Sequence, residues 1–343
     1  IRAWDEQWID APVVLGDRLG AAALGAAAGQ TVVADSTTVL LYKLMRAAAA
    51  GRSDRTEVVA DTENFPTDRF VLEGVAAEHG LTVRWITPDA SHGVTEAQVR
   101  EVLNEQTAFV LLSNVAFKSG FIADVPAITA AAHEFGALVL WDLCHSVGLV
   151  PMQLDAWGVD LAVGCSYKYL NGGPGAPAFA YVSTAAQQEL TQPVQGWFGA
   201  ADPFGMTETY VPARGIRQMI SGTPPILGLQ PISDMVDLIE EAGIDAIREK
   251  SIALTEFAAE FADAHLAHYG VRVISPRDPA IRGGHVTLDH PAFKEIVAAL
   301  WERGIIPDFR PPQGIRIGLS PLSTSFAELA EGLLAIAECL EER

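Results

Sequence analysis

The chain of 343 residues is 49% hydrophobic and 19% charged, a globular composition with room for a large domain and a smaller one. Its formal net charge of −20 repels nucleic acid and anionic membranes, so neither is expected as a partner. No apolar run approaches the roughly 20 residues of a membrane span, and three cysteines without CxxC spacing favour a reducing cytoplasm.

Between about residues 30 and 190, short apolar runs alternate with amphipathic stretches. The expected strands are 57–60, 82–86, 108–112, 137–141, 161–165 and 178–182. The expected helices are 38–50, 69–79, 96–104 and 126–135. This alternation predicts an α/β domain with a mostly parallel sheet that is covered on both faces. Ligands of such sheets bind beyond the carboxyl ends of the strands.

A Gly/Pro-rich passage, 196–225, follows as a long excursion and precedes a helical pattern over about 227–269. Further strands are expected at 271–274, 285–288 and 315–319, with helices at 292–303 and 326–341. We therefore predict a large domain over 31–230 and a smaller α+β carboxyl-terminal domain over 231–343. Residues 1–30 are expected to be a truncated amino-terminal segment, because the chain does not begin with Met.

The first candidate site residue is Asp142, which directly follows an apolar strand. A carboxylate at that position is costly to bury unless it is paired. A pyridinium nitrogen is a suitable partner, because an adjacent carboxylate keeps it protonated. The alternative is that Asp142 caps the following helix, and the residue alone does not decide between the two.

The second candidate is Lys168, which follows an apolar strand and precedes the glycine-rich turn 172–175. Partial desolvation of its amine would lower its pKa and give the neutral nucleophile that Schiff-base chemistry needs. The alternative is an ordinary surface lysine whose stem lies along apolar surface.

The third candidate is the series of hydroxyls Ser36, Thr37 and Thr38 at an expected helix start. Such residues usually cap the helix, but free amides and the helix dipole also favour a phosphate there. A phosphate-type helix start, then a strand-end Asp, then a strand-end Lys resembles the order in fold-type-I enzymes of the class-V aminotransferase group, which depend on pyridoxal 5'-phosphate (PLP).

Other sites are disfavoured. His265 and His268 lack a metal-binding pattern, so we expect no metal, and the glycine-rich turn lacks the Lys-Ser/Thr of a P-loop. No GxSxG elbow is present. Cys144 and Cys165 are interpreted as small buried hydrophobes.

Several segments together resemble the kynureninase family. They are 8–19, 35–39, 65–68, 141–148, 165–171, 195–199, 221–225, 283–286 and 306–310, and they span nearly the whole chain. The resemblance implies a fold-type-I PLP-dependent transferase architecture and a cytoplasmic homodimer with shared active sites. It further implies hydrolysis of the Cβ–Cγ bond of L-kynurenine to anthranilate and L-alanine, in tryptophan catabolism or NAD biosynthesis.

The resemblance also implies a role for each matching residue. Lys168, Tyr167 and Asp142 would be catalytic, with Lys168 carrying PLP as a Schiff base. The residues expected to bind the cofactor are Thr37, Thr38, Phe65, Pro66, Thr67, Asp68, Ser113, Asp142, His145, Tyr167 and Lys168, with Trp197 and Thr223 of the neighbouring subunit. Arg316 would bind the α-carboxylate of the amino-acid substrate, a task suited to a bidentate guanidinium. Trp4 would line the substrate ring.

Three positions depart from the family pattern. Ala200 stands where His is usual, and Phe117 and Ser323 stand where Tyr is common. These departures leave open a paralogue that acts on a modified kynurenine, and 3-hydroxykynurenine is a further possible substrate. Trp4 and Thr223 match the bacterial members that prefer unsubstituted kynurenine. The remaining alternatives are a class-V aminotransferase or lyase and a non-catalytic ligand-binding α/β protein.

Overall fold

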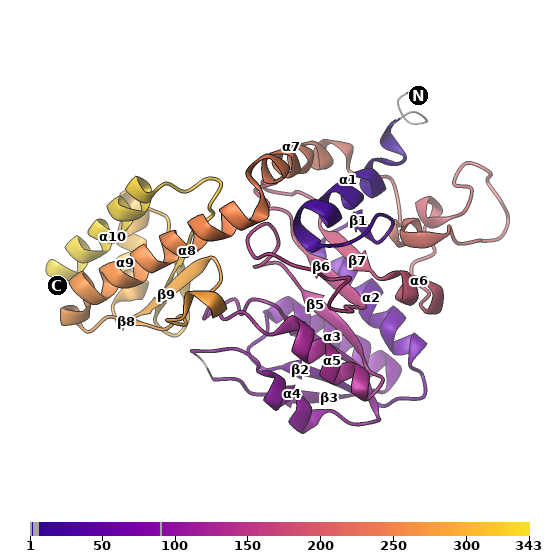
Figure 1. Ribbon diagram of the computed structural model, residues 1–343, viewed down its shortest axis with the longest axis horizontal. Coiled ribbons are helices and arrows are strands. Elements are labelled where there is room, and N and C mark those ends of the chain that lie inside the picture. The colour runs from indigo at the N-terminus through magenta and orange to yellow at the C-terminus, as the bar shows by residue number, and fades with distance from the viewer. Residues whose placement is uncertain (1, 3–6, 90) are drawn as a thin grey trace.

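Seven strands form the central sheet of the larger domain in the computed structural model, which describes residues 2, 7–89 and 91–343 (Figure 1). The strand order is β1-β7-β6-β5-β4-β2-β3. The strands are β1 (Thr31–Val33), β2 (Glu57–Asp61), β3 (Thr82–Ile86), β4 (Thr107–Ser113), β5 (Leu138–Asp142), β6 (Leu161–Gly164) and β7 (Phe179–Val182). Neighbouring strands from β3 to β6 are parallel, whereas β7 runs antiparallel to both β6 and β1. The predicted mostly parallel sheet is therefore confirmed.

Helices cover both faces of this sheet. One face packs against α1 (Ala11–Leu19), α4 (Glu96–Val102), α5 (Val125–Glu134) and α7 (Ile226–Ala242). The other face packs against α2 (Thr37–Gly51), α3 (Pro66–His79) and α6 (Thr184–Glu189). The central strands are buried throughout, which explains why they are continuous apolar runs and do not alternate with polar residues.

The smaller domain holds a four-stranded antiparallel sheet in the order β10-β11-β9-β8. Its strands are β8 (Arg272–Val273), β9 (His285–Asp289), β10 (Asp308–Arg310) and β11 (Gly314–Gly318). Its helices are α8 (Ile244–Phe261), α9 (Phe293–Glu302) and α10 (Phe326–Glu341), which share one apolar core with the sheet. Figure 1 shows this domain beside the large one, with α7 and α8 leading from one to the other.

Short helical turns complete the described part of the chain. They are the π-helical turns Gly20–Leu24 and Ala262–Leu266 and the 3-10 turns Trp197–Gly199, Gly215–Met219, Ala267–Tyr269 and Pro279–Ile281. No helix in the described ranges is long and apolar enough to cross a membrane.

The structure differs from the sequence expectations in a few elements. The helical pattern over 227–269 divides at Gly243, whose φ of 79° breaks the helix at a position that favours glycine. The edge strands β1 and β10 are only three residues long. Strands of this length show no apolar periodicity, so the sequence does not predict them. The predicted boundary at residue 230 falls within α7, whose buried residues belong to the core of the large sheet.

Candidate active site

The carboxyl edge of the large sheet places Asp142 at its centre. Asp142 ends β5 and lies opposite Ser113 of β4 and Val163 of β6. Its side chain is buried, and its Oδ1 accepts a hydrogen bond of 2.6 Å from the amide of Cys144. The turn after β5 therefore fixes the carboxylate at the edge where ligands of parallel sheets bind.

A second buried carboxyl, that of Asp68, lies beside Asp142. Asp68 is in the first turn of α3 and is only 1% exposed. Burial raises the pKa of Asp68 well above its usual range, and the negative charge of Asp142 raises it further. Its Oδ2 is buried without a hydrogen-bond partner among the described residues. Two carboxyls in one dry site favour a shared proton or a cationic partner.

Lys168 reaches the same place from the loop after β6. Its Nζ lies 5.5 Å from the centre of the Phe65 ring and 5.8 Å from the centre of the Tyr167 ring. The lysine charge also acts on Asp68, where it opposes the rise in pKa. The structure thus brings together the predicted residues Lys168, Asp142, Asp68 and Phe65.

Phe65 forms one wall of this cleft. It precedes α3, and its ring meets Phe117 edge to face at 5.4 Å between centroids. The adjacent Asn64 accepts a hydrogen bond of 2.7 Å from the hydroxyl of Ser113. Pro66 and Thr67 form the first turn of α3 between Phe65 and Asp68.

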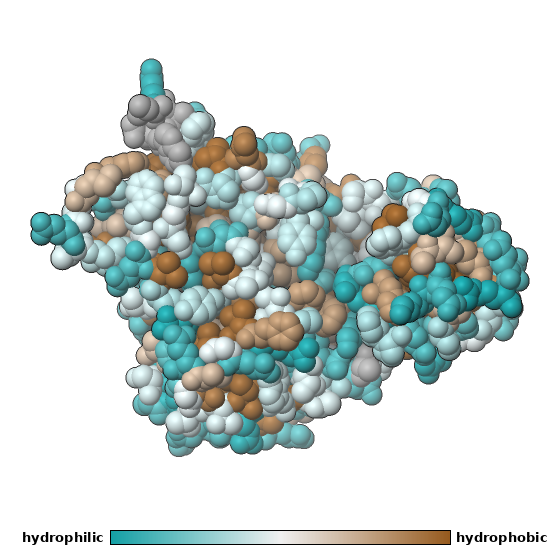
Figure 2. All heavy atoms as spheres, turned by 180° about the vertical axis from the view of Figure 1, so that it is seen from behind, coloured by the Kyte–Doolittle hydropathy of each residue, from teal (hydrophilic) through white to brown (hydrophobic). Residues whose placement is uncertain are grey.

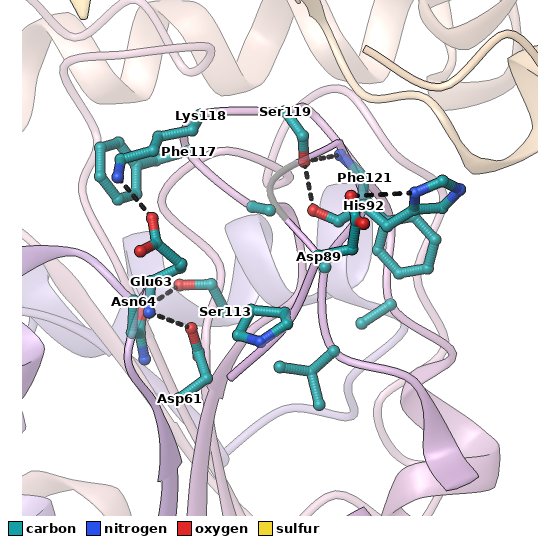
Figure 3. Close-up of a pocket in the computed structure, with 15 residues that line it drawn as sticks. Asp61, Glu63, Asn64, Asp89, His92, Ser113, Phe117, Lys118, Ser119 and Phe121 are labelled. Carbon is teal, nitrogen blue, oxygen red and sulfur yellow. Dashed lines mark hydrogen bonds and ion pairs between the residues drawn. The ribbon is translucent and has the colours of Figure 1, made fainter. Parts of the chain in front are cut away.

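Behind this wall lies a cavity of about 470 Å³, counting space open to solvent. Figure 3 shows Asp61, Asn64 and Ser113 on one side of it, and Asp89 and His92 on the other. Asp61 ends β2 and is 5% exposed. Burial raises the pKa of the Asp61 carboxyl from 3.8 to about 7.

The start of α2 supplies the hydroxyls that were predicted to bind phosphate. Ser36 caps the helix by accepting a hydrogen bond from the amide of Val39. Thr37 is the first residue of α2, and its Oγ1 lies 4.0 Å from the sulfur of Cys144, two residues after Asp142. The described contacts include none between Thr38 and the residues around Lys168. Ser36 is therefore the cap of α2, and the Thr37 hydroxyl is the one with a described contact to the turn after Asp142.

Tyr167 stands at the opening of the cleft and is 52% exposed. Partial burial and the neighbouring Cys165 raise the pKa of the Tyr167 phenol above the usual value of 10. The phenol is therefore protonated at neutral pH and can donate a hydrogen bond.

His145 and Arg316 link the large domain to the small one. Arg316 donates a hydrogen bond of 2.9 Å to the carbonyl of Phe117, and its Nη1 lies 3.3 Å from Nε2 of His145. Burial lowers the pKa of His145 well below its usual range, and the charge of Lys168 lowers it further. The ring is therefore neutral and can accept a hydrogen bond from the arginine.

Two residues predicted for a shared site make no described contact with Lys168, Asp142 or Asp68 within the chain. Trp197 is 44% exposed and packs against Phe198 and Phe204. Thr223 is also exposed and borders a small cavity near Asp35. The predicted contact of Trp4 falls on a residue outside the described part of the chain.

Three residues of the site were not singled out by sequence reasoning. Asn64, His285 and Asp308 lie in or beside segments used for the family resemblance, but no spacing rule marked them as site residues. His285 is buried, with neither ring nitrogen bonded within the described part of the chain, and its ring lies 6.0 Å from that of His145. Burial lowers its pKa to about 3. The sequence feature that could have identified His285 is its position directly after Gly283 and Gly284, at the start of an apolar strand.

Comparison with solved structures identifies the fold. The chain superimposes on a cysteine desulfurase from Thermococcus onnurineus NA1 with a TM-score of 0.86, covering 100% of this chain and 86% of that one at 17% identity. A mutant of C-DES, with glycine covalently linked to the PLP cofactor, also gives 0.86, covering 98% and 87% at 17% identity. The fold is therefore that of the fold-type-I PLP enzymes of class V.

Sequence relatives identify the family. Residues 247–336 match the model of the kynureninase C-terminal domain. The kynureninase of Pseudomonas fluorescens is 37% identical over 100% of this chain and 82% of its own length. That of Burkholderia pseudomallei (strain K96243) is 34% identical over 99% of this chain and 82% of its own length. The chain belongs to the kynureninase family.

Proposed function

We propose that this protein is a PLP-dependent hydrolase that cleaves the Cβ–Cγ bond of L-kynurenine to give anthranilate and L-alanine. The observation that carries the proposal is the cluster of Lys168, Asp142 and Asp68 in a chain whose whole length aligns with kynureninases. The three cysteines, Cys144, Cys165 and Cys339, are all free thiols. Free thiols are typical of the reducing cytoplasm, where we propose that the enzyme acts.

The residues of the cleft fit PLP. The buried Oδ2 of Asp68 lacks a partner among the described residues, and the adjacent carboxylate of Asp142 faces the same edge, so the pair suits a protonated pyridine nitrogen. Thr37 and the free amides of the first turn of α2 suit a phosphate, and the Phe65 ring suits stacking on an aromatic cofactor. The Lys168 amine supplies the covalent attachment.

When bound, PLP supplies an electron sink for the bonds around the substrate Cα. The Lys168 amine would hold the cofactor and would move the proton at the substrate Cα. Asp142 would keep the pyridine nitrogen protonated. Tyr167, whose phenol would stay protonated at neutral pH, would donate a proton to the substrate Cβ as the bond to the γ-carbon breaks, and water added to the γ-carbonyl would leave that carbon as the carboxylate of anthranilate. Arg316 orients the substrate by its α-carboxylate.

We also propose a homodimer in which Trp197 and Thr223 complete the site of the neighbouring subunit. Figure 2 shows apolar patches among polar groups on the face of the molecule opposite to Figure 1. The segment 196–225 is rich in exposed apolar side chains, and these include Trp197, Phe204, Met206 and Val211. A monomer seldom leaves such a set uncovered, and a two-fold interface would cover it.

The test is incubation of the purified protein with L-kynurenine and PLP. Anthranilate, read by its fluorescence, and alanine should form in equal amounts. Lys294→Ala, which removes an exposed lysine of α9, should react like the wild type, while Lys168→Ala should not. Release of alanine without anthranilate, or no reaction with the wild type, would refute the proposed reaction.

A further inference from the structure

Asp308 faces Arg316 across the β10–β11 pair. The two residues are direct partners in the antiparallel register, so their side chains lie on the same face of the small sheet. Arg316 Nη2 donates a hydrogen bond of 2.5 Å to Oδ2 of Asp308. Arg310 Nη2 donates one of the same length to the same oxygen. One carboxylate thus holds two guanidinium groups.

The remaining bonds of Arg316 leave one edge of its guanidinium available. Nη2 is held by Asp308, and Nη1 by the carbonyl of Phe117 at 2.9 Å. Arg316 Nε donates no hydrogen bond to any described residue. The side chain is 14% exposed. Both terminal nitrogens are therefore anchored before a ligand arrives, while the Nε edge keeps a donor for a carboxylate.

Arg310, Arg316 and Asp308 together carry one net positive charge, apart from the nearby Lys168, whose charge lowers the pKa of His145 and His285. Arg310 and Arg316 are cationic, and Asp308 is the carboxylate between them. His145 and His285 are neutral at pH 7, because burial lowers the pKa of each. Lys118, in the neighbouring loop, is paired with Glu63. The balance suits a ligand with a single carboxylate, whereas loss of Asp308 would leave two mutually repelling guanidiniums.

We propose that Asp308 is a positioning residue that holds the Arg316 guanidinium in the orientation that receives the α-carboxylate of the substrate. This inference rests on the proposed function, in which Arg316 is the carboxylate-binding residue. Asp308 acts through Arg316 and does not touch the substrate. Its contribution therefore belongs to substrate binding, because the same contact holds Arg316 before and after the chemical step.

The small sheet offers a matched control in Asp289. Its Oδ2 accepts hydrogen bonds from Arg272 at 2.5 Å and from Gln313 at 2.9 Å. Asp289 and Arg272 are also direct partners in an antiparallel register, between β8 and β9. Asp289 thus has the same kind of cross-strand pair as Asp308, but its arginine is 70% exposed and makes no contact with the Phe117 carbonyl.

The experiment compares Asp308→Asn and Asp289→Asn as PLP-loaded enzymes. We expect Asp308→Asn to raise KM for L-kynurenine about tenfold and to change kcat by no more than about threefold. Asp289→Asn should leave both constants unchanged. Asp308→Glu, which keeps the charge but shifts the carboxylate, should give a KM between those of the wild type and Asp308→Asn. That variant also keeps the test open if Asp308→Asn folds poorly.

Binding of L-alanine, followed by the visible absorbance of the loaded enzyme, gives a second reading that needs no turnover. Asp308→Asn should weaken this binding by about the same factor as it raises KM. Equal alanine affinity in Asp308→Asn and the wild type, or an equal loss in Asp289→Asn, would overturn the inference. A wild type that binds alanine but forms no anthranilate would refute the proposed reaction alone, because the role of Asp308 is read from the alanine affinities.

Discussion

Two regions of the large domain differ in how complete they are within one chain. At the carboxyl edge of the sheet, Asp142, Asp68 and Lys168 are brought together by β5, α3 and the loop after β6, and both carboxyls are buried. In the segment 196–225, Trp197 and Thr223 are exposed and make no described contact with that cluster. Strand ends can assemble a site by themselves, because the sheet fixes their positions. No strand of the sheet fixes the segment 196–225, so its side chains need a second surface, such as a neighbouring subunit, to form a site.

The largest expected effect on turnover is at the carboxyl edge of the sheet, where one chain supplies all the residues of the cluster. Lys168→Ala removes the only amine that the structure places against the Phe65 ring and the carboxyl pair, among the residues it describes. Turnover should fall by at least about a thousandfold, since a covalent anchor and a base are lost together. The protein should still fold, and borohydride should no longer fix the cofactor covalently to the protein. Turnover at the wild-type rate would remove Lys168 from the mechanism.

Asp142→Asn tests the same cluster through charge alone. The amide can still accept the hydrogen bond from the amide of Cys144, but it cannot hold a proton on a pyridine nitrogen. We expect kcat to fall about a hundredfold or more, with PLP still bound. Exchange of the substrate Cα proton with solvent deuterium should slow in parallel. An unchanged exchange rate would mean that Asp142 is only a structural partner of Cys144.

Mixed dimers test whether the segment 196–225 contributes Trp197 to the site of the neighbouring subunit. Trp197→Ala should lose most activity, and so should Lys168→Ala. When the two variants are unfolded and refolded together, one site of each mixed dimer keeps both residues. About a quarter of the wild-type activity should return, since half of the dimers are mixed and each has one intact site. No recovery, despite mixed dimers detected by mass, would place both residues in the same subunit's site.

The difference between the two regions also explains what the sequence could predict. Asp142 and Lys168 each follow an apolar run, so strand periodicity places both at one edge of the sheet. Asp68 was identified only through the family resemblance, because its burial against Asp142 depends on how α3 packs. The pairing of Asp308 with Arg316 depends on the register of β10, a three-residue strand whose pattern is too short to predict.

Asp61 gives a smaller effect, on stability. Its folded pKa of about 7 lies above the usual 3.8, so the folded state binds this proton more tightly than the unfolded state does. Its contribution is fully present below about pH 4 and is lost as the pH rises to about 7. Asp61→Asn should therefore flatten the fall in unfolding free energy between pH 5 and 7, by up to about 3 kcal/mol.

Denaturant titrations across that range measure the Asp61 effect. Asp89→Asn is the control from the same cavity. The pKa of Asp89 is lowered, chiefly by its hydrogen bond from Ser91, so Asp89 titrates below this range and its removal should not change the slope. Equal slopes for wild type and Asp61→Asn would show that Asp61 is ionised in the folded protein at pH 5.

The smallest expected effect concerns the ring of the substrate. At Thr223, which is exposed, the family resemblance contrasts the Thr of bacterial members with the Asn of animal members. A hydrogen-bonding Asn would be left unpaired by a ring without a hydroxyl, and such a loss discriminates strongly. Thr is smaller, and its hydroxyl can turn to another partner, so it makes no such demand.

We therefore expect kcat/KM to be several-fold higher for L-kynurenine than for 3-hydroxy-L-kynurenine. Three departures from the family act against this order, because Ala200 opens space beside Trp197 while Phe117 and Ser323 remove phenol groups. Phe117 packs on Phe65 and Ser323 donates a hydrogen bond to Asn171, so both are used within the chain and Ala200 is the position left to admit a substituent. Ala200→His should widen the preference for the plain ring. Kinetics with both substrates, on wild type and this variant, decide the matter, and a wild type that prefers the hydroxylated ring would contradict it.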